Sequence, residues 1–166
     1  MDSTQPDTVK LVTAVLDSLH LHHAHAKEAN IDKYFECFSP HAQFLGTASD
    51  ESWSMAEYRE YMTPIYKLSN IAAQFLPKEG CRKFGYYPSI EYPEYVTFDE
   101  ILECQGQNIQ VRGTGALAFD PDSRKWLIVL YHLNVPIPND VANEVCHVIK
   151  RHSTERGGLP SKEEST

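Results

Sequence analysis

Four histidines stand within six residues of the sequence, in the stretch HLHHAHAK from His20 to Lys27. Histidine is the commonest metal ligand in proteins, so this cluster raises the question of a metal site. A metal-binding helix presents its ligands four residues apart on one face, as in H-E-x-x-H. No two of these histidines have that spacing, since His20 and His23, like His22 and His25, are three residues apart. The sequence therefore predicts no metal site here. The core face of the predicted helix includes His23 and borders His22, and exposed histidines flank this face.

Polar side chains also recur within the strand-like segments VRGTG and YHLN. Because side chains alternate along a strand, Arg112 and Thr114 share one face of the first segment. His132 and Asn134 share one face of the second segment for the same reason. Each face mixes polar with apolar groups, as a pocket wall does where a few polar groups orient the ligand. We therefore predict that Arg112, Thr114 and Asn134 bind a ligand and that His132 takes part in catalysis.

Two carboxylates stand side by side in the segment FDE, as Asp99 and Glu100. They point to opposite faces of one strand, so only one of them can share a cavity with His132. The register of the sheet decides which one, and the sequence does not reveal the register. A carboxylate beside histidine and arginine in an apolar cavity can act as a general base with a shifted pKa. The alternative is an arginine–carboxylate pair that only holds the strands together, and both interpretations stay open.

Large aromatic side chains stand near the expected cavity. Trp53 and Tyr58 follow the polar segment GTASDE, and core packing is the ordinary role of such residues. Tyr58 has the stronger case for a ligand contact, because a buried hydroxyl needs a partner. We predict both as ligand-binding residues. The tyrosine-rich segment of residues 77–95 is either an interaction surface or a loop at the pocket mouth.

The helices that must position these residues are indicated by periodicity and capping. Apolar residues at helical spacing, without Gly or Pro, predict a helix over residues 8–27. Asn30 is a candidate N-cap of a second helix, which stops at the Ser-Pro pair of residues 39–40. Ser54 and Glu57 form a capping box that opens a third helix.

The rest of the chain is mostly β. Strands are predicted over residues 41–48, 71–76, 95–104, 109–119 and 126–135. Turns rich in Gly, Asp and Ser join the last three as hairpins. A closing helix is predicted over residues 140–152, within a single domain of residues 1–152, and the polar residues 153–166 form a flexible tail. Helices followed by an antiparallel meander indicate an α+β fold, with a cavity between a curled sheet and the helices on one of its faces.

The composition excludes several classes of protein. The chain has 166 residues and a net charge of −8, so it lacks the basic face that a nucleic-acid-binding protein needs. No apolar run approaches the ~18 residues of a membrane span, and the first residues do not resemble a secretory signal. The four cysteines form no C-x-x-C pair, so neither a zinc site nor a redox motif is expected. Reduced, widely spaced cysteines predict a cytoplasmic protein.

The segments GTASDESWS, FDEILE, VRGTGALAF and KWLIVLYHLNVPIPND resemble the SnoaL-like branch of the nuclear transport factor 2-like superfamily. The resemblance covers roughly residues 9–145, and the run of residues 125–140 is its most specific part. It implies a cone-shaped α+β fold with a curved, mostly antiparallel sheet, three N-terminal helices on its concave face and a short C-terminal helix. It also implies a deep pocket and frequent homodimers. It does not imply one function, because members include isomerases, cyclases, dehydratases, transport factors and assembly domains.

Two hypotheses of function follow. The first is a protein that binds a hydrophobic small molecule in a deep pocket and works, without metal or cofactor, as an isomerase, cyclase or hydratase. The alternative is a non-catalytic homodimerisation or scaffold module of a larger assembly. An enzyme needs an acid–base group in an open cavity, whereas a scaffold can have its cavity plugged by aromatic side chains. We also predict a homodimer through the outer face of the sheet, because long strands with apolar residues need covering.

Overall fold

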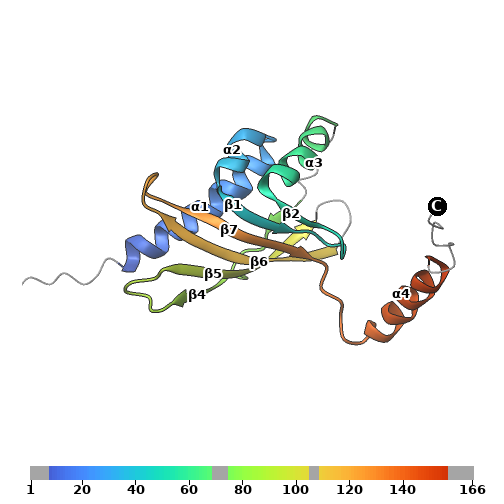
Figure 1. The fold of residues 1–166 in the computed structure, drawn as a ribbon. Helices are drawn as coiled ribbons and strands as arrows, with labels where there is room; N and C mark the ends of the chain where they lie inside the picture. Colours follow the sequence, from blue (N-terminus) through green and yellow to red (C-terminus); the bar gives the residue numbers. More distant parts are fainter. Residues whose placement is uncertain (1–7, 69–74, 105–108, 157–166) are drawn as a thin grey trace, which may run out of the picture. The chain divides into compact units, whose positions relative to one another are not determined.

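The structure is a computed structural model that describes residues 8–68, 75–104 and 109–156. The chain divides into two compact units, residues 1–135 and 136–166. The first unit holds helices α1 to α3 and the sheet, and the second holds helix α4 (Figure 1). None of the described helices is long and apolar enough to cross a membrane.

Helix α1 (Thr8–Lys27) has the bounds that its periodicity predicts. Its buried residues are Val15, Leu19, His22 and Ala26, which form one stripe of the helix. His23, next to this stripe, is only 10% exposed. The low exposure of His23 agrees with its predicted place on the core face, whereas His22, predicted at the border of that face, is buried. The reason is that α1 packs against α2, β7 and β3, so that more than a narrow stripe of its surface is covered.

Two capping interactions predicted from the sequence are present. At the start of α2 (Ile31–Glu36), the side-chain oxygen of Asn30 accepts the backbone N–H of Lys33 at 3.2 Å. At the start of α3 (Met55–Leu68), Glu57 Oε2 accepts the backbone N–H of Ser54 at 2.8 Å and the Ser54 hydroxyl at 2.7 Å. These contacts satisfy backbone donors that a helix start leaves without an intrahelical partner.

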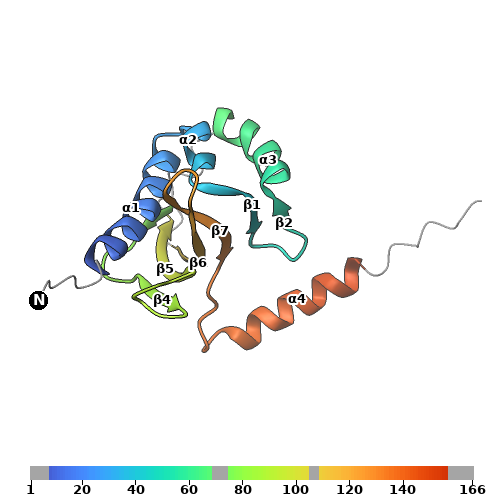
Figure 2. The ribbon, with the colours of Figure 1, turned by 60° about the vertical axis from the view of Figure 1, so that its left-hand side comes forward.

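Seven strands form one sheet in the order β2-β1-β7-β6-β5-β3, with β4 also paired to β5. Their bounds are β1 (Phe38–Leu45), β2 (Ser52–Ser54), β3 (Phe75–Pro77), β4 (Lys83–Tyr87), β5 (Tyr95–Cys104), β6 (Ile109–Asp120) and β7 (Lys125–Asn134). All paired neighbours are antiparallel except β1 and β7. Figures 1 and 2 show α1, α2 and α3 on the same side of this curved sheet. The predicted α+β fold is confirmed.

The long strands β5, β6 and β7 lie within a residue of their predicted bounds, but the short strands differ. Strand β1 begins at Phe38, three residues before the predicted start. This is possible because Pro40 lies where the pairing of β1 with β7 is irregular, so that its missing N–H costs no ladder bond. Residues 71–74 of one predicted strand lie outside the described residues, and β2 was not predicted.

A β-bulge in β7 decides which of its side chains face the helices. The pairing with β6 skips Val129, which is the extra residue of the bulge. Ile128 before it and Tyr131 after it are both buried, although they are three positions apart. In an uninterrupted strand, residues at that spacing point to opposite faces. The bulge therefore brings Tyr131 to the inner face of the sheet, which the helices cover, and leaves His132 on the outer face.

The second unit is described by itself. Its helix α4 (Ala142–Arg156) continues past the predicted end at His152. Residues 153–156 of the predicted flexible tail therefore belong to a helix, and residues 157–166 lie outside the described residues. The single domain that ends at residue 152 stays a prediction.

The capping box at α3 generates the first testable prediction. Ser54→Ala removes a hydroxyl that bonds Glu57 and should lower the free energy of unfolding by about 1 kcal/mol, as N-cap replacements do. Urea denaturation followed by circular dichroism measures this change. Ser49→Ala, at an exposed loop position outside the box, is the matched control and should leave stability within error. Equal stability of Ser54→Ala and the control would contradict the capping role.

Candidate functional site

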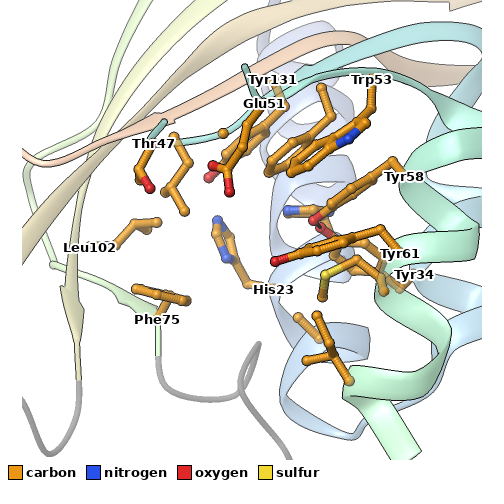
Figure 3. Close-up of a pocket in the computed structure, with 17 residues that line it drawn as sticks. His23, Tyr34, Thr47, Glu51, Trp53, Tyr58, Tyr61, Phe75, Leu102 and Tyr131 are labelled. Carbon is orange, nitrogen blue, oxygen red and sulfur yellow. Dashed lines mark hydrogen bonds between the residues drawn. The ribbon is translucent and has the colours of Figure 1, made fainter. Parts of the chain in front are cut away.

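A cavity of about 280 Å³ lies between the helices and the inner face of the sheet, and we call it the inner pocket (Figure 3). Its wall is mostly aromatic, with rings from Tyr34, Phe44, Trp53, Tyr58, Tyr61 and Tyr131. Its titratable side chains, apart from the tyrosines, are His22, His23 and Glu51. An apolar wall with few polar groups is typical of small-molecule sites.

The aromatic wall is built from stacked rings contributed by β1, β2, α3 and β7. The rings of Phe44 and Tyr58 are 3.9 Å apart and nearly parallel at 11°, and Phe44 and Tyr131 are parallel within 4°. Trp53 stacks on Tyr61 at 4.8 Å nearer the mouth, where Tyr61 is exposed. The hydroxyls of Tyr34 and Tyr58 bond each other at 3.0 Å. Burial raises the pKa of both phenols, so both are neutral at physiological pH.

Behind this wall, Glu100 of β5 is completely buried, with 0% of its surface exposed. Its Oε1 lies 2.8 Å from Nε2 of His23 and 2.9 Å from the hydroxyl of Tyr131. Its Oε2 accepts the Nε–H of Arg82 at 2.8 Å. Since a carboxylate only accepts, Nε2 of His23 must carry the proton of that hydrogen bond. We call these four residues the Glu100 cluster.

The partners of Glu100 keep it ionised. Burial alone would raise the pKa of this carboxyl group, but the hydrogen bond and charge of His23 and the charge of Arg82 outweigh it. The result is a pKa lowered from 4.5 to about 2. The same negative charge and burial raise the pKa of the Tyr131 hydroxyl well above its usual value, with burial as the larger cause. The cluster therefore holds a buried carboxylate and a neutral phenol.

Gly113 makes this arrangement sterically possible. It pairs with Glu100 across β5 and β6, on the inner face. A Cβ atom at this position would collide with the Tyr131 hydroxyl and would lie 3.2 Å from Cγ of Glu100. The absent side chain thus leaves the space in which Tyr131 reaches the carboxylate.

Two histidines of α1 line the inner pocket in different states. His23 is anchored through Nε2 to Glu100, so its other ring nitrogen, Nδ1, is not engaged by this hydrogen bond. His22 is buried among aromatic rings, and this burial, followed by the influence of His23, lowers its pKa well below 6.5. Its Nδ1 has no hydrogen-bond partner among the described residues. Both imidazoles therefore offer polar atoms at an otherwise apolar wall.

Glu51, in the loop between β1 and β2, supplies a carboxylate to the same space. Figure 3 shows Glu51 and His23 pointing into the pocket from opposite sides, with the Tyr61 hydroxyl also directed inward. Glu51 Oε2 accepts the backbone N–H of Ala48 at 3.0 Å. Its side chain packs against Gly46, where any Cβ would collide with it. The loop thus holds Glu51 over the pocket.

The structure places the predicted site residues in two groups. Trp53 and Tyr58 line the inner pocket, and Glu100 lies directly behind its wall. Asp99 lies on the outer face of the sheet, where Nε of Arg112 is 3.3 Å from Asp99 Oδ1. Register places three further predicted residues on this outer face, namely Thr114, His132 and Asn134.

The prediction that Arg112 and His132 share a sheet face agrees with the register, because Arg112 pairs with Asn134 and Thr114 with His132. The further prediction that this face lines the pocket is wrong, and the bulge at Val129 is the physical reason. Ile128 is buried, and strict alternation from it would carry His132 inside as well. The catalytic and ligand-binding roles assigned to these outer residues stay predictions.

Sequence reasoning missed His23, Arg82 and Glu51 as site residues. His23 gave a usable signal, since a histidine on the core face of a helix requires a buried partner. Arg82 stands 18 residues before Glu100, in a segment without clear periodicity, and gave none. Glu51 lies in a turn rich in acidic residues, a pattern that predicts exposure to solvent.

Within residues 8–68, 75–104 and 109–156, no three His, Cys, Asp or Glu side chains are placed to hold a metal ion together. All four cysteines are free thiols. The predicted cytoplasmic location stays a prediction.

Comparison with known proteins identifies a family. The model of the SnoaL-like domain matches residues 12–138. No curated protein matches the chain. An NTF2-like protein of unknown function from Pseudomonas putida has a similar structure, with a TM-score of 0.62 and 7% identity over 78% of this chain and 89% of that chain.

Two other solved structures carry functional names. A candidate ketosteroid isomerase from Shewanella frigidimarina has a TM-score of 0.53 and 15% identity, over 71% of this chain and 92% of that chain. A candidate calcium/calmodulin-dependent protein kinase II association domain from Xanthomonas campestris has a TM-score of 0.51 and 19% identity. The match covers 77% of this chain and 86% of that chain. At such identities these similarities show a common fold alone.

The depressed pKa of Glu100 generates a prediction about stability and pH. A group whose pKa falls from 4.5 to about 2 on folding stabilises the protein above pH 4.5, and this stabilisation is lost as the pH falls toward 2. The loss should be about 3 kcal/mol. Urea denaturation of the wild type and of Glu100→Gln from pH 6 to about 2 measures it.

Glu100→Gln should be less stable than the wild type at pH 6 and should lack this part of the pH dependence. Asp99→Asn, which removes the half-exposed neighbouring carboxylate, is the control and should keep the pH dependence of the wild type. If the wild type and Glu100→Gln lose stability in parallel on acidification, the pKa of Glu100 is not depressed.

Proposed function

The chain belongs to the SnoaL-like domain family, and on that premise we propose that it binds a small, mostly apolar molecule in the inner pocket and catalyses proton transfer on it. The observation that carries this proposal is His23, held at the pocket wall by the ionised Glu100. The Glu100 carboxylate fixes the orientation and the tautomer of this imidazole. It also stabilises the imidazolium that forms when Nδ1 accepts a proton. His23 is therefore the general base of the proposal.

Other pocket groups complete the proposed chemistry. Glu51 and the Tyr61 hydroxyl enter the space that His23 faces, so they can return a proton or orient a polar group of the ligand (Figure 3). His22 Nδ1 can accept a hydrogen bond from a ligand, since it has no partner among the described residues. Isomerisation, cyclisation and hydration each require proton transfer at carbon or oxygen, which is what such groups perform.

The inner pocket also limits the size and shape of the ligand. Its volume of about 280 Å³ is at the low end of small-molecule sites, which extend from ~300 to 1,000 Å³. The rings of Phe44, Tyr58 and Tyr131 lie parallel to one another in the pocket wall. A flat ring compound with one or two polar groups suits this shape. The name of the ketosteroid isomerase relative is compatible with such a ligand but does not identify it.

The alternative function is a non-catalytic homodimerisation or scaffold module, as the association-domain relative is named. The outer face of the sheet favours this role, because Ile101, Ala116, Ala118 and Leu130 keep part of their surface exposed there. Both functions can coexist, since the inner pocket and the outer face lie on opposite sides of the sheet. A homodimer through the outer face is therefore part of the proposal.

Catalysis can be tested with 5-nitrobenzisoxazole, a flat bicyclic probe whose ring opens when a base removes its C–H proton. The electron pair of the C–H bond then forms the nitrile, and the N–O bond breaks. The oxygen leaves as a phenolate, which absorbs visible light. The wild type should accelerate this reaction, and His23→Gln should lower the rate constant about 100-fold, the usual contribution of a general base. His41→Gln, an exposed histidine of β1, is the matched control and should change nothing.

Glu51→Gln separates the two candidate bases. It should lower the rate less than His23→Gln, provided that circular dichroism shows both variants folded. An unchanged rate in His23→Gln would overturn the role of His23, and a complete loss in Glu51→Gln alone would assign the base to Glu51.

The proposed homodimer has its own prediction. Light scattering at about 20 micromolar, a concentration at which interfaces of standard size are occupied, should give twice the chain mass of 18.9 kDa. Leu130→Glu places a charge on the outer face and should give monomers. Leu21→Glu, at an exposed apolar position of α1, is the control and should stay dimeric. A monomeric wild type would contradict the dimer.

A further inference from the structure

A second cavity, of about 560 Å³, lies between α1 and the segment that joins β3 to β4. One stripe of α1 forms one side of it, with Leu16, His20, His23, Ala24 and Lys27 at helical spacing. The opposite side runs from Leu76 to Phe84. We call this cavity the α1–β4 groove. Among the residues that the structure describes, only His23 lines both this groove and the inner pocket.

Three basic side chains gather at the groove in an acidic protein. Lys27, Lys78 and Arg82 line it together with the carboxylate of Glu79. Lys78 and Arg82 also pair with carboxylates outside the lining, those of Glu103 and Glu100. The chain as a whole has a net charge of −8, so an anion that approaches it at random is repelled. Lys78 lies 3.9 Å from Glu103 in a half-exposed pair, which at that distance leaves its ammonium group able to contact another acceptor.

Arg82 adds a donor that the fold does not use. Its Nε bonds Glu100, but its Nη2 is buried and has no hydrogen-bond partner among the described residues. The Arg82 side chain as a whole is 11% exposed. An unsatisfied buried donor of a charged group is costly. A guanidinium presents its N–H groups in a fork that fits the oxygens of a carboxylate or a phosphate.

The remaining wall of the groove is apolar. Leu16 and Ala24 contribute it from α1, and Leu76, Pro77 and Phe84 from the facing side. A ligand that contacts both the basic side chains and the apolar wall of the groove therefore carries a negative head group and an apolar body. We propose that the α1–β4 groove binds a small amphipathic anion, a carboxylate or phosphate monoester joined to a short apolar chain. This site is separate from the inner pocket and does not depend on the proposed function.

Isothermal titration with octanoate and octyl phosphate tests the proposal on the full chain. At least one of them should bind, and the tighter of the two identifies the head group. Lys27→Gln and Lys78→Gln should each raise the Kd by about threefold to tenfold, as expected for the loss of one ionic contact. Lys83→Gln is the matched control, because Lys83 is the neighbour of Arg82 but faces away from the groove, and it should leave the Kd unchanged.

Two further variants distinguish the groove from the inner pocket. Ala24→Phe fills the groove from an exposed position of α1 and should abolish binding. Thr47→Phe narrows the inner pocket from an exposed loop position and should leave the Kd for octanoate within error. Circular dichroism confirms that both variants are folded.

Several results would overturn the proposal. These are the absence of binding by both anions up to about 10 millimolar, equal binding of 1-octanol, or equal weakening by Lys83→Gln and the two groove lysine variants. Loss of binding in Thr47→Phe but not in Ala24→Phe would assign the anion to the inner pocket instead. None of these results bears on the rate of the benzisoxazole reaction, so the two proposals fail independently.

Discussion

The burial of the Glu100 carboxylate is the constraint on which the rest of the structure depends. An ionised carboxylate without partners is too costly to bury, so the fold must bring donors to it. His23 of α1, Arg82 just before β4 and Tyr131 of β7 supply them at 2.8 to 2.9 Å. Three elements far apart in the sequence are thereby held to β5. A loss of any one donor leaves the buried carboxylate with one hydrogen bond fewer.

The Glu100 cluster also positions side chains in both the inner pocket and the α1–β4 groove. It directs His23 to the wall of the inner pocket and holds Arg82 at the wall of the α1–β4 groove. Glu100 itself lines neither cavity, so it acts by positioning other groups. An interaction that stabilises the fold therefore also positions side chains in the two cavities for which we propose ligands.

Local sequence patterns predicted the elements well. The bounds of α1, the N-cap Asn30 and the capping box of Ser54 and Glu57 depend on residues within one or two turns of each other, and the structure has them as predicted. The bounds of the long strands could be predicted equally well, because the alternation of apolar and polar residues and the turn residues are also local features of the sequence. The resemblance of FDEILE and the segments after it to a known family pointed to the confirmed fold.

The sequence by itself determined the order of the helices and the long strands, the α+β class and which polar residues share a face of β6 and of β7. Only the tertiary structure decided which face is inside. One extra residue, Val129, reverses the direction of every side chain after it, which turned His132 outward and Tyr131 inward. The pairing of His23 with Glu100 joins residues 77 positions apart. Such a contact depends on strand register and helix packing, which arise from the whole chain and leave no mark at either residue.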